Sequence, residues 1–167
     1  MKALFVTLVA FVACVAFAPL SALGDTWGQP INDTTRFVVL ASYNNEAVLD
    51  RETGLVWEQS PSTFTMTWDT AHNHCLGAQK GNRRGWRVPT IQELFSLVDP
   101  TQSNPALPPG HPFSGVLSAP YWSATSFDSA PGSAWLADFT VGGRPGFLKT
   151  DSANCWCVRG GQGVDHQ

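Results

Sequence analysis

The sequence is poor in charge. Asp, Glu, Lys and Arg make up only 14% of its 167 residues, whereas about 25% is usual in a soluble domain. Disordered acidic or basic proteins combine high net charge with few aromatic residues, so seven Trp and a net charge of −3 exclude that class. The slightly acidic balance also argues against a general nucleic-acid-binding protein, which would be basic. The length fits one domain.

Long apolar runs are scarce as well. The longest follows Lys2, covers residues 3–18 with one polar interruption, and ends at Pro19. It is shorter than the roughly 20 residues that a membrane span requires. A positive start, a short apolar run and small residues after it predict a secretory signal peptide over residues 1–24. Cleavage after Ala22 and retention as an anchor are the alternatives.

Cysteines are too few for a disulfide-dense miniprotein, since the chain has four. Cys14 lies inside the apolar run and is interpreted as part of the discarded segment. Three cysteines, Cys75, Cys155 and Cys157, then remain in the exported chain, where an oxidising compartment favours disulfides.

The remaining chain divides into a polar lead-in over residues 25–35, a domain over 36–161 and a flexible tail over 162–167. Strands precede two helices, and a proline-rich loop over residues 100–120 precedes further strands, which predicts a single α+β domain. Strands are expected at 36–41, 47–50, 55–58, 121–125, 135–141, 147–150 and 155–159. Gly54 is expected to supply a positive φ in the loop after the second strand.

The two helices carry their own sequence signals. Thr67 is a plausible N-cap for a helix over residues 67–79, whose expected apolar face holds Trp68, Ala71, Cys75 and Ala78. A second helix follows Pro89, where Thr90 and Glu93 have the spacing of a capping box. It is expected to end before Pro100.

Six short motifs occur in one order along the domain. They are Asp50-x-x-Thr53-Gly54-Leu55-Val56-Trp57, Thr67-Trp68-x-x-Ala71-x-x-x-Cys75, Gly85-Trp86-Arg87-Val88-Pro89-Thr90-x-x-Glu93-Leu94, Tyr121-Trp122-Ser123-x-Thr125, Ala134-Trp135-x-x-Asp138-Phe139 and Cys157-Val158-Arg159-Gly160-Gly161. Together they resemble the C-terminal domain family of the bacterial collagen-like adhesin Lcl, over about residues 36–161. The resemblance implies a C-type-lectin-like fold with two helices, small antiparallel sheets and a long irregular loop. It also implies distant kinship with the formylglycine-generating enzyme, although kinship of fold does not transfer function.

The family pattern implies a disulfide between Cys75 and Cys157. Such a bridge closes a loop of about 80 residues and is worth roughly 4 kcal/mol in the chain-entropy model. Cys155 departs from the family pattern and faces the same side of a strand as Cys157. It is expected to be an unpaired buried thiol, an intermolecular bridge or a competing partner for Cys75.

Metal, cofactor and catalytic sites are not expected. His72 and His74 are two residues apart on a helix and point in different directions, and neither they nor Cys155 and Cys157 have structural zinc spacing. The sequence motifs of calcium-dependent sugar binding are missing, as are a catalytic triad, a paired carboxylate site and a phosphate loop. Of the seven Trp, those in the motifs are expected in the core, whereas Trp27 and Trp156 lie at edges where a ligand ring could stack.

A compact basic cluster is the strongest indication of binding. Lys80, Arg83, Arg84 and Arg87 fall within eight residues of an otherwise acidic chain. The adhesin of the family binds sulfated polysaccharides, and clustered Arg suits sulfate geometry. The alternative is an ordinary solvated loop, and Arg87 has a structural alternative because it belongs to a family motif.

These observations predict a secreted or periplasmic, surface-exposed binding domain without enzymatic activity. Its expected ligand is an extracellular polysaccharide, sulfated or otherwise polyanionic, or a protein, bound by the 100–120 loop and the basic cluster. Nucleic acid and membrane are not expected partners after signal removal. One alternative is a homo-oligomeric subunit of an extracellular assembly, contacting its neighbours through Cys155 and the lead-in. Another is a copper-dependent oxidase resembling the formylglycine-generating enzyme, which requires a reduced cysteine pair.

Overall fold

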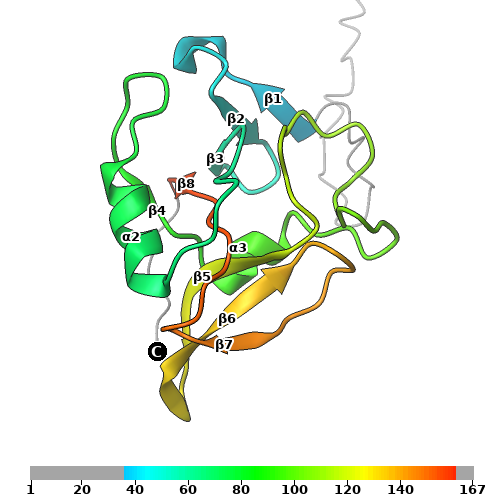
Figure 1. Cartoon of the computed structure of the whole chain (residues 1–167). Helices are drawn as coiled ribbons and strands as arrows, with labels where there is room; N and C mark the ends of the chain where they lie inside the picture. The colour runs from blue at the N-terminus through cyan, green and yellow to red at the C-terminus, as the bar shows by residue number, and fades with distance from the viewer. Residues whose placement is uncertain (1–35, 161–167) are drawn as a thin grey trace, which may run out of the picture. The chain divides into compact units, whose positions relative to one another are not determined.

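Two antiparallel sheets and two short α-helices make up the computed structural model, which describes residues 36–160 (Figure 1). The larger sheet has the strand order β1-β2-β3-β8-β4. Its strands are β1 (Phe37–Val39), β2 (Ala47–Asp50), β3 (Val56–Glu58), β8 (Val158–Arg159) and β4 (Trp86–Arg87). The last strand of residues 36–160, β8, therefore lies between β3 and β4 and pairs with both.

The smaller sheet has the order β5-β6-β7 and lies at the opposite end of the view in Figure 1 from β1 and β2. Its strands are β5 (Pro120–Phe127), β6 (Ala130–Asp138) and β7 (Gly146–Leu148). Helix α2 (Trp68–Gly77) packs on β4 and β5, and helix α3 (Ile91–Phe95) packs on β5 and β6. This arrangement confirms the predicted α+β class.

Local sequence signals place several elements well. The strand expected at 47–50 coincides with β2, and Gly54 has the expected positive φ of 71°. Thr90 caps α3 through the predicted capping box, in which its side chain accepts a hydrogen bond from Glu93 N while the Glu93 carboxylate accepts one from Thr90 N. Helix α3 is nevertheless shorter than expected, since it ends at Phe95 rather than before Pro100.

Several predicted strand boundaries were wrong, and two strands differ most from the prediction. Strand β6 begins at Ala130, five residues earlier than expected, because this segment pairs with β5 on one side and β7 on the other. At the C-terminal end, strand β8 covers only Val158–Arg159 and not 155–159. The cysteines that precede it belong to no strand and contact α2 instead.

The core consists of two clusters. One is aromatic and surrounds Trp156, whose ring centroid lies 4.9 Å from that of Phe113 and 5.6 Å from those of Trp57 and Phe139. The other surrounds the disulfide-bonded Cys75 and contains Trp86 and Trp122. Trp156 is fully buried, so the expectation that it lies at an edge and stacks on a ligand was wrong.

The proline-rich segment is irregular, as expected, but it is pinned to the domain. Ala106 N donates to Phe139 O, Asn104 N donates to Thr140 O, and the Leu107 and Phe113 side chains are buried in the aromatic cluster. No helix among residues 36–160 is both long and apolar enough to cross a membrane. The predicted signal peptide, lead-in and tail, together with Trp27, lie outside the described residues.

Candidate functional site

The loop between α2 and β4 carries the basic cluster and is built on a tight turn. Gly81 and Asn82 both have positive φ, 56° and 57°, and Arg83 N donates to Lys80 O at 3.0 Å across the turn. A Cβ at Gly81 would lie 2.2 Å from the Cα of Tyr43, so only glycine permits this approach. The turn is thereby fixed against the 3₁₀ helix η1 (Ala41–Tyr43).

Tyr43 organises the cationic side chains around it. The Arg83 guanidinium lies over the Tyr43 ring, 4.6 Å from its centroid, and Arg159 Nη1 donates to the Tyr43 hydroxyl at 2.7 Å. Arg159 Nε also donates to Arg84 O at 2.9 Å. Arg83, Arg84 and Arg159 therefore converge on one edge of the larger sheet, and we call these three residues the arginine edge.

Arg159 was not among the predicted binding residues. It lies 75 positions from Arg84 in the sequence, and the two meet because β8 pairs with β4, where Trp86 lies opposite Arg159. The only sequence signal was its presence in the last family motif. Its position beside the basic cluster could be predicted only from the pairing of β8 with β4.

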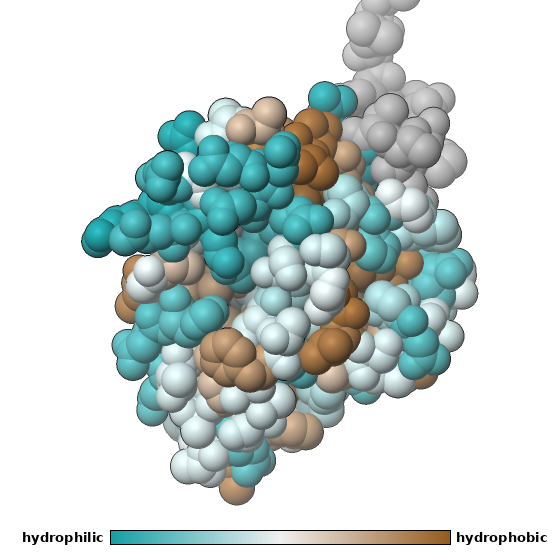
Figure 2. All heavy atoms as spheres, turned by 45° about the horizontal axis from the view of Figure 1, so that its top comes forward, coloured by the Kyte–Doolittle hydropathy of each residue, from teal (hydrophilic) through white to brown (hydrophobic). Residues whose placement is uncertain are grey.

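The arginine edge is largely free of compensating charge. Arg83 and Arg84 are exposed, and neither forms a salt bridge with any residue in 36–160. The Gln79 amide, when its oxygen faces the guanidinium, accepts from Arg84 Nη2 at 2.8 Å. One carboxylate is close by, because Glu46 Oε2 accepts a hydrogen bond from Gly81 N at 2.6 Å. Figure 2 shows hydrophilic residues gathered over the side of the molecule to which this loop projects.

Lys80 faces the interior more than solvent. Its Nζ lies 3.4 Å from Oε1 of Glu58, a carboxylate with only 2% of its side-chain surface exposed. Burial raises the pKa of Glu58, and the neighbouring Lys80 charge opposes that rise. Lys80 therefore offsets a buried negative charge, which reduces its availability to a ligand.

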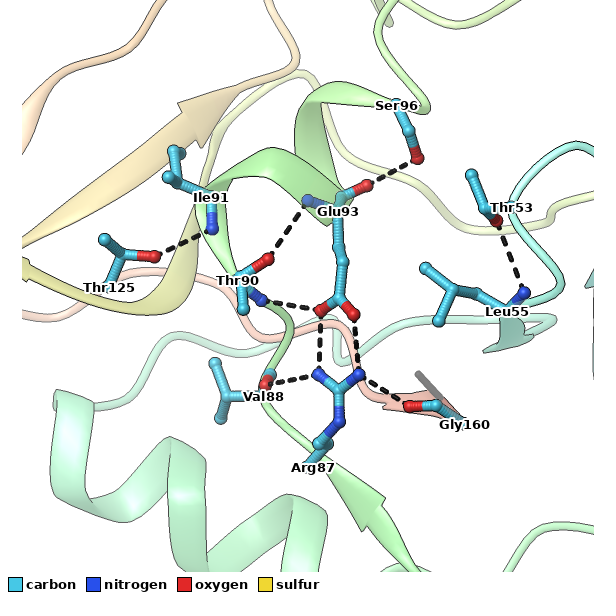
Figure 3. A network of polar contacts seen from close by, with 10 residues as sticks. All are labelled: Thr53, Leu55, Arg87, Val88, Thr90, Ile91, Glu93, Ser96, Thr125 and Gly160. Carbon is cyan, nitrogen blue, oxygen red and sulfur yellow. Dashed lines mark hydrogen bonds and ion pairs between the residues drawn. The ribbon is translucent and has the colours of Figure 1, made fainter. Parts of the chain in front are cut away.

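Arg87 has turned away from the cluster into a structural network (Figure 3). Its guanidinium forms two hydrogen bonds with the Glu93 carboxylate, at 2.6 and 2.7 Å, and donates to Gly160 O at 2.6 Å. The same carboxylate caps α3 through Thr90 N. Of the four predicted binding residues, the structure brings Arg83 and Arg84 together at the surface and engages Lys80 and Arg87 elsewhere.

The three cysteines form a second, buried cluster. Cys75 and Cys157 are joined by a disulfide with a Cα–Cα distance of 5.5 Å, as the family pattern implied. Cys155 is a free thiol with no exposed surface, and its Sγ lies 3.3 Å from Cys75 Sγ. A sulfur without exposed surface cannot reach a neighbouring chain in this conformation, which leaves the unpaired thiol and the competing partner as the applicable alternatives.

Two groups of metal-ligating side chains gather at the same place. Within the described part of the chain, Cys75, Cys155 and Cys157 form one group, and Glu58, His74 and Cys157 form the other. Because Cys75 and Cys157 are oxidised to a disulfide, two of the three sulfurs are not thiolates, the form that binds metals. The expectation that no metal or cofactor is bound stays a prediction.

Comparison with protein-family models identifies the family of the chain. Residues 46–159, more than half of the chain, match the family model of the Lcl C-terminal domain. Trp86, Arg87, Thr90 and Glu93, whose contacts are described above, all fall within the matched range. No curated protein matches the chain.

Proposed function

The chain belongs to the Lcl C-terminal domain family, and we propose that it is an extracellular adhesion domain that binds a sulfated polysaccharide through the arginine edge. The family is generally non-catalytic. Binding without chemical conversion of the ligand is accordingly the proposed activity.

An extracellular or periplasmic location is supported by two independent features. The disulfide between Cys75 and Cys157 is of the kind that persists in oxidising compartments. The first 24 residues have the composition of a secretory signal peptide. Both features support a location in which the arginine edge meets extracellular glycans.

The observation that carries the proposal is the geometry of the arginine edge. The guanidinium groups of Arg83 and Arg159 both contact Tyr43, and Arg159 also donates to the backbone oxygen of Arg84. Arg83 and Arg84 lack a carboxylate partner among residues 36–160. A guanidinium is planar and presents paired N–H donors, which match the oxygens of a sulfate group. Rigid anchoring by Gly81 lowers the entropy lost when a ligand binds.

The other two predicted functions have lost support. The assembly hypothesis used Cys155 and the lead-in over residues 25–35 as contacts to neighbouring chains; the thiol is buried, and the lead-in lies outside the described residues. The oxidase hypothesis required a reduced cysteine pair, whereas Cys75 and Cys157 are joined. Homo-oligomerisation through other surfaces stays a prediction, which light scattering on the mature protein would check.

Heparin affinity chromatography of the mature protein tests the proposal. We expect Arg83→Ala/Arg84→Ala to bind about tenfold more weakly, since two contacts of about 0.7 kcal/mol each are removed. We also expect wild-type retention to fall steeply with salt and not to change with EDTA.

The matched control is Arg51→Ala/Arg144→Ala, which removes two exposed guanidinium groups elsewhere on the domain. The control should bind like the wild type if the arginine edge is the site. Equal weakening by both double variants would indicate non-specific attraction, and retention of the Arg83/Arg84 variant at wild-type salt would overturn the proposal.

A further inference from the structure

Three sulfur atoms lie in mutual contact beneath helix α2. Cys75, Cys155 and Cys157 are all fully buried, and their sulfurs lie within 4.8 Å of one another. The free Cys155 Sγ is 3.3 Å from Cys75 Sγ, one of the two sulfurs of the disulfide. It also donates a hydrogen bond to the carbonyl oxygen of Ala71 at 3.8 Å.

Backbone geometry presents both C-terminal cysteines to the same partner. Cys157 is bonded to Cys75 of α2, and Cys155 Sγ contacts Cys75 Sγ and the Ala71 oxygen of the same helix, so both cysteines face α2. The segment is held in place because Ser62 N donates to Cys155 O and Glu58 N donates to Cys157 O. Cys75 Sγ is therefore bonded to one sulfur of this segment and in contact with the other.

We propose that Cys155 is an exchange thiol, and that the Cys75–Cys157 disulfide interconverts with a Cys75–Cys155 disulfide inside the folded domain. The Cys155 thiolate attacks Cys75 Sγ, the Cys75–Cys157 bond breaks, and its electron pair leaves on Cys157 Sγ. One disulfide and one thiol exist before and after the step, so no oxidant or reductant is consumed. The proton lost from Cys155 is balanced by the proton that Cys157 gains.

The surroundings of the two thiol positions differ. Cys155 lies next to the Ala71 carbonyl, whereas the sulfur of Cys157 lies within 4.8 Å of Glu58 on β3 and His74 on α2. Lys80, from the α2–β4 loop, completes the charged groups facing Glu58. Exchange thus moves the free thiol from a position beside the Ala71 carbonyl to one close to the Glu58 carboxyl group and the His74 imidazole, which can supply the proton for the leaving thiolate.

The rate of exchange should depend strongly on pH. Burial, followed by the negative charge of Glu58, raises the pKa of Cys155 to about 12. Because only the thiolate attacks, the exchange rate should rise about tenfold for each pH unit below that value. At neutral pH the disulfide therefore rearranges slowly, and alkaline conditions reveal the exchange.

Thiol mapping of the mature wild-type protein is the first test. Samples incubated between pH 7 and pH 10 are quenched in acid, unfolded, labelled with a maleimide and digested, and the labelled cysteine is identified by mass spectrometry. We expect the label to move from Cys155 to Cys157 with time, about ten times faster per pH unit. Label confined to Cys155 at every pH at which circular dichroism shows the folded protein would overturn the proposal.

A pair of variants provides the second test. Cys157→Ser should form the Cys75–Cys155 bridge and show no free thiol, just as its matched control Cys155→Ser keeps the Cys75–Cys157 bridge. Two labelled cysteines in folded Cys157→Ser, or a dimer on non-reducing electrophoresis, would contradict the proposal. If Cys157→Ser does not fold, the wild-type mapping decides.

Discussion

At the scale of single residues, Glu58 connects the basic loop between α2 and β4 to the buried cysteine cluster. Its Oε1 pairs with Lys80 of the basic loop, and its Oε2 accepts from Cys157 N, next to the disulfide. Its backbone oxygen accepts from Trp156 Nε1 at 2.9 Å, in the aromatic core. The ion pair with Lys80 is long, at 3.4 Å. A buried carboxylate that is so weakly compensated is costly to ionise, which is the physical reason that burial raises the pKa of Glu58.

The raised pKa of Glu58 predicts how stability depends on pH. The folded state holds the Glu58 proton more tightly than the unfolded chain, whose pKa is near 4.5. The stability that this proton contributes is complete below that value and is lost as pH rises through the folded pKa. Glu58→Gln cannot ionise, so its unfolding free energy relative to wild type should increase with pH above 4.5, as measured by urea unfolding.

The control for this experiment is Asp128→Asn, which removes an exposed carboxyl group. Its unfolding free energy should run parallel to that of the wild type across the same pH range. A constant difference between Glu58→Gln and wild type would show that Glu58 does not titrate differently in the folded and unfolded states.

Residues of the family motifs act mainly as local structural devices. Asp50 pairs with Arg36 and accepts from Glu52 N and the Thr53 hydroxyl, which closes the loop between β2 and β3. Asp138 accepts from Thr140 N at the turn after β6. These motifs identify the family, but the contacts of their residues stabilise the fold and do not indicate which ligand is bound.

At the scale of elements, α3 depends on contacts with its neighbours. A helix of five residues is too short to be stable alone. The Arg87–Glu93 pair ties it to β4, and the Ile91 N–H donates to the Thr125 hydroxyl of β5 (Figure 3). The network thus joins both sheets through one helix N-terminus.

Breaking this network should destabilise the domain. Glu93→Ala removes the cap on Thr90 and leaves the half-buried Arg87 without its partner, which we expect to cost about 1–3 kcal/mol in urea unfolding. Gln92→Ala, in the same helix but exposed, is the matched control and should change stability by less than about 0.5 kcal/mol.

A double-mutant cycle with Arg87→Ala separates the ion pair from the cap. A coupling energy above about 0.5 kcal/mol is expected for two residues in direct contact. Additive effects of the two substitutions would contradict the network described for this helix.

At the scale of the whole molecule, the disulfide links distant parts of the chain. Cys75 and Cys157 are separated by 82 positions, and the bridge joins α2 to the segment that leads into strand β8, which lies between β3 and β4. Such a long loop restricts the unfolded chain strongly. The bridge therefore contributes stability to a domain whose sheets are small and whose helices are short.

Removal of Cys75 tests this contribution. Cys75→Ser abolishes both the observed bridge and the proposed alternative, so it should lower the unfolding free energy by about 4 kcal/mol. Cys155→Ser retains the bridge and is the control, expected to change stability far less. Cys75→Ser with wild-type stability in urea would show that the bridge does not constrain the unfolded chain.

The sequence alone determined the features that depend on neighbouring residues. The capping box of Thr90 and Glu93, the positive φ of Gly54 and the β2 strand follow from local chemistry, and the ordered motifs established the family. The sequence did not predict the start of strand β6, because Ala130, Pro131 and Gly132 favour strands poorly. Pairing with β5 and β7 holds this segment in the sheet. Helix α3 ends early where Ser96 O accepts from Arg36 Nη2 at 2.6 Å, a contact across 60 residues.

Only the tertiary structure decided what the candidate residues do. It turned Arg87 toward Glu93, brought Arg159 to Arg84, buried Trp156 and placed Cys155 against the disulfide. Each of these outcomes depends on which strands pair and which side chains fill the core. Those choices minimise the free energy of the whole chain, so they cannot be read from the spacing of residues in one segment.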